Sequence, residues 1–337
     1  MKKKSSIKII AEAGVNHNGK IRLAKKLIDA ASEAGADFIK FQMYNVDNLI
    51  VKNTGLADYQ KKQITKNISQ YDMLMKLSLS KKNFYELYAY SKRKKINFLV
   101  SPFDLDSCFF LKLLGLKFFK IPSGEINNIP YLEILGKFKQ NIIMSTGMSN
   151  LDEINMALKT LIKAGTNKNK ITVLHCNSEY PTPIEDINMK AMITIKNKFG
   201  VNVGYSDHSD SLEVPIVAAS LGAQIIEKHI TLNKKMNGPD HLASMNPLQF
   251  KKMVQNIRNC ETILGSAMKK PSPSEIKNIK LVRKSIVAKI NIQKGDKFSK
   301  ENLTIKRPGN GISAIHLKTI IGKKSNKNYF KDDLIKL

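Results

Sequence analysis

IKIIAEAGVNHNGKIRLAKKLIDAASEAGADFIKFQ, residues 7–42, is the stretch that decides the fold of this chain. The apolar runs at its two ends are typical of short buried strands. Between them, Leu23, Leu27, Ile28 and Ala31 recur at the spacing of one helix face. The order of strand, helix and strand predicts a parallel βαβ unit.

The same alternation continues along the chain. Eight strand candidates span residues 7–14, 36–42, 96–103, 117–125, 141–147, 171–177, 201–207 and 224–230. Helix-like segments separate most of them, and a polar region at about 45–80 is expected to be irregular. Eight βα units predict an α/β fold, a (β/α)8 TIM barrel. A doubly wound sheet is the alternative, but AGVNHNG lacks the glycine spacing of its phosphate loop.

The composition changes after Leu264. GSAMKKPSPSEIKNIK (265–280) combines prolines with small polar residues, as linkers do. The segment that follows predicts short strands and turns. We therefore expect a catalytic barrel at 1–265, a linker at 266–280 and a small β-rich domain at 281–337.

The formal net charge of the 337-residue chain is +28. The lysines are spread along the chain, without a long basic tail or the aromatic interleaving of RNA-binding proteins. We therefore expect no nucleic-acid partner, and an anionic substrate would benefit from the same field. No run approaches the ~18 uncharged apolar residues of a membrane span. Cys108, Cys176 and Cys260 form no paired motif, which favours a reducing, cytoplasmic location.

Each strand candidate begins apolar and ends polar. The polar residues at these ends include Glu12, Lys40, Gln42, Ser101, Lys120, Ser123, Glu125, Ser145, Ser178, Ser206, His208, Glu227, Lys228 and His229. In a barrel all the carboxyl ends of the strands meet on one face, where active sites are built. The sequence thus predicts a single polar bowl of the size of a small ligand.

Two lysines in this bowl indicate an anion site. Lys40 and Lys120 would be partly buried ammonium groups that need a negative partner. Hydroxyl donors for phosphate or carboxylate oxygens come from Ser101, Ser123, Ser178 and Ser206.

His208 and His229 end neighbouring strand candidates and would meet in the barrel. With Glu12 and water nearby, they favour a site for Mn²⁺ or Mg²⁺. The alternative is a pair of hydrogen-bonded core histidines. Strand alternation turns Glu227 and His229 to one side and Lys228 to the other, toward the helices, where it needs a separate partner.

The motifs resemble those of a known family. They are, in order, AEAGVNHNG, KFQ, SPFD, KIPSGE, STGM, HCNSEYPTP, GYSDHS, EKHITL and GPDHLAS. Together they resemble the sialic acid synthase family, which makes nine-carbon 2-keto acids. The tail VRKSIVAKINIQKGDKFSKENLTIKRPGNGIS is similar to its C-terminal antifreeze-like (SAF) domain. One departure is Val100-Ser101-Pro102-Phe103, where serine replaces the usual threonine and keeps the hydroxyl.

The resemblance implies a transferase that condenses phosphoenolpyruvate with an open-chain N-acylated hexose and releases phosphate. It implies that phosphoenolpyruvate is held by Lys40, Lys120, Ser123, Ser178 and Ser206, with Gln42 and Ser101 in the same substrate site. It implies that His208 and His229 bind the divalent metal. Contacts to the sugar or to metal-bound water would come from Glu12, Glu125, Tyr180 and Asp240. Arg307 would reach the N-acyl group in the barrel of a partner subunit, in a domain-swapped homodimer.

The expected product is N-acetylneuraminate, made from N-acetylmannosamine. The alternative is N,N'-diacetyllegionaminate, made from a 2,4-diacetamido-2,4,6-trideoxyhexose. Two other classes are further alternatives: a metal-free Schiff-base aldolase that uses Lys120 or Lys228, and a basic binding module without catalysis.

Overall fold

The computed structural model describes residues 7–63 and 68–337. The chain divides into two compact units, Met1–Gly265 and Ser266–Leu337. Each unit has its own hydrophobic core.

The first unit is a barrel of parallel strands, as the sequence predicts. Its strands are β1 Lys8–Gly14, β2 Phe38–Met43, β3 Asn97–Pro102, β4 Phe118–Ile121, β5 Asn141–Ser145, β6 Ile171–Cys176, β7 Asn202–Asp207 and β8 Ile225–His229. Their order in the sheet is β3-β2-β1-β8-β7-β6-β5-β4, and the first and last strands of this order also lie against each other. The TIM-barrel prediction is therefore confirmed.

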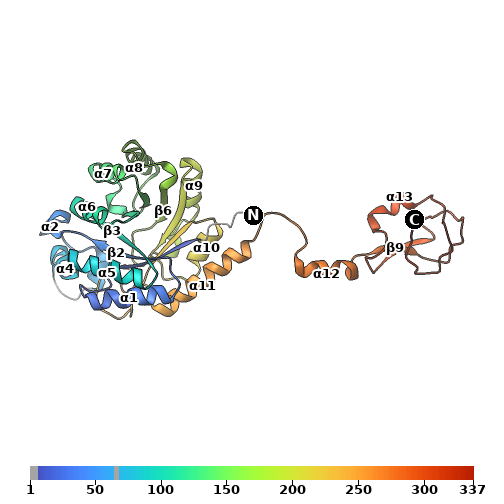
Figure 1. Ribbon diagram of the computed structural model, residues 1–337, viewed down its shortest axis with the longest axis horizontal. Helices are drawn as coiled ribbons and strands as arrows, with labels where there is room; N and C mark the ends of the chain where they lie inside the picture. Colours follow the sequence, from blue (N-terminus) through green and yellow to red (C-terminus); the bar gives the residue numbers. More distant parts are fainter. Residues whose placement is uncertain (1–6, 64–67) are drawn as a thin grey trace. The chain divides into compact units, whose positions relative to one another are not determined.

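Helices surround the strands (Figure 1). They are α1 Ile21–Glu33, α2 Val46–Leu49, α3 Asp58–Gln63, α4 Gln70–Leu77, α5 Lys81–Arg93, α6 Leu105–Leu113, α7 Ile129–Lys137, α8 Leu151–Lys163, α9 Lys190–Phe199, α10 Val214–Ser220 and α11 Pro247–Leu264. On α1 the apolar pattern buries Leu27, Ile28 and Ala31 against the barrel. At the start of α8, the Asn150 side chain accepts hydrogen bonds from the Asp152 and Glu153 amides and caps the helix.

An apolar layer inside the barrel fixes where the site lies. Its members come from separate strands: Ile10, Phe38, Leu99, Ile143, Leu174 and Ile225, with Phe118 packed against them. Side chains two residues apart on a strand point to the same face. The next inward layer, toward the carboxyl ends, therefore holds Glu12, Lys40, Ser101, Lys120, Ser145, Cys176 and Glu227. A dry apolar floor thus supports a layer of polar groups.

The expectation of an irregular region at 45–80 was wrong, because this region contains α2, α3 and α4. Asn45 caps α2, and Ser69 caps α4 by accepting a hydrogen bond from the Asp72 amide. Met73 and Leu77 are four residues apart, so both lie on the buried face of α4. Such short helices carry too few apolar repeats for a clear periodic signal.

The second unit is small and β-rich. It contains α12 Pro273–Val282, the antiparallel strands β9 Ser285–Ala288 and β10 Leu303–Lys306, and α13 Leu317–Ile320. Its core consists of Ile286, Ala288, Ile292, Phe298, Leu303, Ile320, Tyr329 and Ile335. Helix α12 lies largely within the expected linker, because Ser272 and Glu275 form a capping box at its start.

Candidate active site

A cavity of about 400 Å³ opens at the carboxyl ends of the barrel strands. It brings together most of the residues that the sequence singles out: Glu12, Lys40, Gln42, Ser101, Lys120, Ser123, Ser178, Tyr180, Ser206, His208, His229 and Asp240. They come from seven of the eight strands or the loops that follow them, so the barrel itself gathers them.

Glu227 lies at the centre of the charged groups. Its Oε1 is 3.0 Å from Lys40 Nζ and 3.6 Å from Lys120 Nζ, and it accepts a 2.9 Å hydrogen bond from Ser206 Oγ. Lys40 Nζ also lies 3.4 Å from Glu12 Oε2. All four charged side chains are almost fully buried. Lys40 and Lys120 thus both pair with Glu227, and Lys40 also pairs with Glu12.

Burial and these neighbours set the charges. Burial raises the pKa of Glu12 to about 7, although Lys40 opposes this shift. Burial opposes ionisation of Glu227, yet Lys120 and Lys40 hold its pKa well below the usual range. Burial lowers the pKa of Lys120 to about 8, whereas Glu12 and Glu227 raise the pKa of Lys40 against the effect of burial. With Glu12 partly protonated near neutral pH, the cluster carries excess positive charge.

Hydroxyl groups complete the polar layer. Lys120 Nζ donates a 2.7 Å hydrogen bond to Ser145 Oγ, and the Gly147 amide donates to Ser123 Oγ at 2.9 Å. A side chain at Gly147 would place its Cβ 2.1 Å from Ser178 Oγ, so only glycine fits there. Ser101 Oγ is buried and has no hydrogen-bond partner within the described residues. A donor in such a position is available to a bound ligand.

The two histidines lie beside each other, as predicted. Their ring centroids are 5.5 Å apart, and Tyr180 stacks on His208 at 4.0 Å. Burial lowers the pKa of His208 to about 4 and that of His229 well below its usual value, so both rings are neutral at pH 7. Neutral imidazole is the metal-binding form.

The ring nitrogens differ in their partners. His208 Nδ1 donates to the Asn177 carbonyl at 2.5 Å, which directs Nε2 elsewhere. His229 Nδ1 is buried without a hydrogen-bond partner in the part of the chain that the structure describes, and lies 3.9 Å from Asp240 Oδ2. Across that same part, no group of three or more His, Cys, Asp or Glu side chains is placed to hold a metal ion. The chain thus offers two neutral imidazoles, and one nitrogen of the second, His229 Nδ1, has no hydrogen-bond partner within the described residues. This pair fits a metal ion with open positions for water and substrate.

Lys228 has the separate partner that its side of β8 requires. Its Nζ lies 2.7 Å from Asp207 Oδ2 and also donates to the Ser209 carbonyl, and both ionic side chains are fully buried. Asp207 Oδ1 in turn accepts from the Ser209 amide at 2.9 Å. This network holds the residues on both sides of His208. Lys228 does not line the cavity, so it is not placed for Schiff-base chemistry there.

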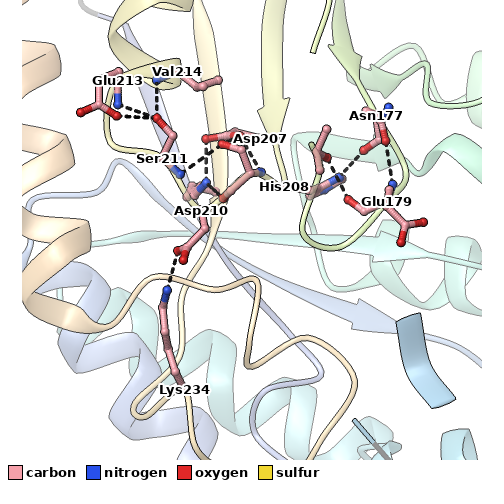
Figure 2. Close-up of polar contacts among 12 residues, drawn as sticks. Asn177, Glu179, Asp207, His208, Asp210, Ser211, Glu213, Val214 and Lys234 are labelled. Carbon is pink, nitrogen blue, oxygen red and sulfur yellow. Dashed lines mark hydrogen bonds and ion pairs between the residues drawn. The ribbon is translucent and has the colours of Figure 1, made fainter. Parts of the chain in front are cut away.

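The loop that carries His208 is tied to its surroundings at several points (Figure 2). Figure 2 shows the hydrogen bond between the His208 ring and the Asn177 carbonyl, and the ion pair between Asp210 and Lys234. The Thr182 amide also donates to the His208 carbonyl at 3.0 Å. His208 is therefore held from both flanks.

Besides Lys228, Glu125 and Arg307 are singled out by the sequence but are not in the cavity lining. Glu125 ends the 3₁₀ turn Ser123–Glu125 and accepts a 2.7 Å hydrogen bond from Asn128 Nδ2. The turn makes Glu125 a helix-capping partner rather than a strand-end residue. Arg307 belongs to the second unit, where its Nε donates to the Val282 carbonyl at 3.0 Å.

Two of the strand-end residues, Glu227 and Ser145, were given no substrate-binding role by the sequence interpretation. Glu227 pairs with both lysines. Ser145 receives the Lys120 hydrogen bond. One side of the cavity is apolar and includes Val15, Met73, Leu74 and Leu77. The positions of Ser145 and Glu227 on their strands were visible in the sequence, whereas nothing in the sequence interpretation pointed to the apolar residues of α4.

No helix in the described residues is long and apolar enough to cross a membrane.

The NeuB family model matches residues 27–269, and the SAF domain model matches residues 283–337. N,N'-diacetyllegionaminic acid synthase from Campylobacter jejuni is 50% identical over 97% of this chain and 98% of its own length. The enzyme of that name from Legionella pneumophila is 45% identical over 95% of this chain and 90% of its own length.

A solved structure shows the same fold. N-acetylneuraminic acid synthetase from Leptospira borgpetersenii superposes with a TM-score of 0.71 and 34% identity, over 81% of this chain and 90% of that one. The chain therefore belongs to the NeuB family, with a C-terminal SAF domain, and is an enzyme of the nonulosonate synthase type.

Proposed function

We propose that this protein is an N,N'-diacetyllegionaminate synthase. It condenses phosphoenolpyruvate with a 2,4-diacetamido-2,4,6-trideoxyhexose and water and releases phosphate. The observation that carries the proposal is the identity of 50% and 45% to two synthases of that name, against 34% to an N-acetylneuraminic acid synthetase. The first expectation, N-acetylmannosamine as the sugar, has weaker support than this alternative.

The lysine cluster suits the anionic substrate. Phosphoenolpyruvate carries a carboxylate and a phosphate, and Lys40 and Lys120 supply two cations that both form ion pairs with one central carboxylate. Ser101, Ser123, Ser178 and Ser206 donate to the remaining oxygens. Lys40, Lys120, Ser101 and Ser206 stand on barrel strands, and Ser123 and Ser178 lie in the segments just after β4 and β6, so the strands position most of the anion site.

His208 and His229 hold a divalent cation, Mn²⁺ or Mg²⁺, in this proposal. When bound, such an ion polarises the sugar aldehyde as a Lewis acid. The protein contribution is the neutral state of both rings and the Asn177 hydrogen bond that orients His208. Asp240, whose pKa burial raises to about 6, is the nearby carboxyl group for the sugar or for water.

Glu12 is the residue placed to move the proton. The C3 carbon of phosphoenolpyruvate attacks the aldehyde carbon, whose C=O π electrons move onto the oxygen, and water adds at the electron-deficient C2. Glu12, with a pKa of about 7, takes the proton that this water releases and passes it to the new alkoxide, which becomes a hydroxyl group. The tetrahedral carbon then expels phosphate by cleavage of its C2–O bond, and the proton of the C2 hydroxyl group leaves with the phosphate. Glu227 remains ionised between the lysines and limits their repulsion.

The cellular setting and assembly belong to the same proposal. The three cysteines are buried and free, which suits a reducing cytoplasm. Arg307 contacts the sugar N-acyl group in the barrel of a second subunit, so the active form is a domain-swapped homodimer.

A substrate panel tests the proposed function. The full chain is incubated with phosphoenolpyruvate, Mn²⁺ and either the diacetamido-trideoxyhexose or N-acetylmannosamine, and the product is weighed by mass spectrometry. We expect the higher kcat/KM with the first sugar. A higher value with N-acetylmannosamine would contradict it. Borohydride added with substrate gives no trapped adduct if Lys120 acts only as a cation.

The metal assignment makes its own prediction. His208→Ala and His229→Ala should each abolish metal-dependent phosphate release and weaken Mn²⁺ binding, measured by electron paramagnetic resonance, because each removes half of the imidazole set. Phosphoenolpyruvate affinity and the circular dichroism spectrum should stay near those of the parent. Full activity in either variant would rule out this metal site.

A further inference from the structure

The apolar side of the cavity is formed by one short helix and a neighbouring loop. We propose that this surface, Val15, Met73, Leu74 and Leu77, is the specificity determinant that receives the methyl groups of the sugar, and we call it the α4 wall. The inference rests on the proposed function, because it explains how the site prefers a 6-deoxy, doubly N-acetylated sugar.

The α4 wall is held in place before any ligand arrives. Tyr44 OH donates to the Leu74 carbonyl at 3.3 Å, and the Gln70 amide donates to the Thr54 carbonyl at 3.0 Å. A Cβ at Gly19 would lie 2.4 Å from the Lys76 carbonyl oxygen, so the helix end packs directly on the loop after β1. A preformed surface selects a ligand without an ordering cost at binding.

The wall lies on the sugar side of the cavity. Lys40 and Lys120 belong to the strand layer, which is the place for the anion. The helix residues of the wall come from the segment beyond β2, and Val15 comes from the loop after β1. Tyr44, which donates to the Leu74 carbonyl, lies near Asp240: burial raises the pKa of this tyrosine, and the Asp240 carboxylate raises it further. Asp240 is next to His229, where the aldehyde reacts in the proposed function.

The chemistry of the two sugars differs at two carbons. The diacetamido-trideoxyhexose has a methyl group at C6 and an acetamido group at C4, where N-acetylmannosamine has hydroxyl groups. A methyl group against an apolar surface is favourable, whereas a hydroxyl group there loses hydrogen bonds to water. The side-chain oxygen of Gln60, a polar residue near the wall, already accepts a hydrogen bond from the Ala57 amide at 3.0 Å. The wall thus favours the deoxy sugar.

The test compares polar substitutions on the same helix. Leu74→Asn is nearly isosteric and its residue is only half-buried, so the fold should tolerate it. Met73→Gln is the second variant. Met75→Gln is the matched control, because Met75 is 51% exposed on α4 and does not line the cavity. For each protein, kcat/KM is measured with both sugars, together with the KM for phosphoenolpyruvate and the melting temperature.

We expect the preference for the deoxy sugar, expressed as the ratio of the two kcat/KM values, to fall about tenfold in Leu74→Asn and Met73→Gln. The KM for phosphoenolpyruvate should not change, and Met75→Gln should keep the parent ratio. If the parent prefers the deoxy sugar but both folded wall variants keep its ratio, the wall assignment is overturned and the proposed function stands. If the parent prefers N-acetylmannosamine, the proposed function itself fails.

Discussion

Lys120 is the residue whose charge is most sensitive to pH within the anion site. Burial lowers its pKa to about 8, whereas the carboxylates around Lys40 keep that second lysine protonated. The free enzyme therefore loses one of its two cations just above neutral pH. Lys40 and Glu227 persist as a pair, with their atoms 3.0 Å apart.

The first prediction concerns this loss. The kcat/KM for phosphoenolpyruvate should fall about tenfold per pH unit above pH 8, because Lys120 must be protonated to bind the anion. The measurement is a pH profile at saturating sugar. Lys120→Arg, which stays charged, should remove this alkaline decline even if its overall rate is lower. An unchanged decline in Lys120→Arg would assign the ionisation to another group.

Residue identity alone did not reveal which carboxylates face the cavity. Glu12 was expected there as a polar residue at a strand end and does line the cavity, but Glu125 follows a strand that ends four residues earlier, at Ile121. The turn after this strand sends its carboxylate to Asn128. Alternation predicts side-chain direction only while the strand lasts, and the sequence does not show where that ends.

At the scale of elements, β7 and β8 are joined on their outer face by a buried ion pair. Lys228 and Asp207 have no exposed surface, and their backbones are paired in the sheet. Removal of one partner leaves a buried charge without compensation, which costs more than a lost surface contact.

Lys228→Met should therefore lower the free energy of unfolding by about 3–5 kcal/mol. Lys234→Met is the control, because Lys234 pairs with Asp210, whose side chain is 60% exposed, and should cost less than about 1 kcal/mol. Urea unfolding followed by circular dichroism measures both. Equal losses in the two variants would show that the buried pair adds no special stability.

A second element-scale prediction concerns the contact between α4 and the loop after β1. Gly19→Ala should lower both the unfolding free energy and the kcat/KM for sugar, because the new methyl group meets the backbone at Lys76. Gly115→Ala is the matched control: Gly115 has φ +84° but open space around it, so only the conformational cost of about 1–2 kcal/mol applies. If both variants keep the parental sugar kinetics, α4 does not depend on this contact.

The strands were easier to predict than the helices. Each barrel strand is buried and apolar on both faces near its start, which gives a strong signal. Helices α4 and α12 depend on the capping residues Ser69 and Ser272 in polar segments, and half of the residues of α9 are polar, with Met192 and Ile195 buried among them. Local capping chemistry, rather than periodicity, decides such helices.

At the scale of the whole molecule, the proposed function assigns to the SAF unit a group that the barrel cavity lacks. The barrel cavity contains two lysines but no arginine, within the described residues. Arg307 stands next to Pro308 at the end of β10 in the SAF unit. The proposed homodimer makes each complete site depend on two chains.

Mixed dimers test this sharing. Arg307→Ala and Lys40→Ala should each be inactive with the sugar, but co-expressed with different tags they should regain about a quarter of the parental activity. Random assortment makes half of the dimers mixed, and each mixed dimer has one intact barrel facing one intact arginine. Failure of isolated mixed dimers to recover activity would show that Arg307 serves its own chain, and full activity of Arg307→Ala alone would show that the arginine has no role.

The placement of the α4 wall has a consequence for engineering. The anion-binding groups stand on barrel strands, where Gly147 leaves no room for a side chain and neighbouring residues interlock. Three of the four wall residues, Met73, Leu74 and Leu77, lie on one excursion between β2 and α5, outside that interlocked layer, whereas Val15 follows β1. A designer who wants a different nine-carbon acid should therefore diversify residues 68–79 and keep the strand ends fixed, so that one short cassette changes the sugar while the condensation chemistry is retained.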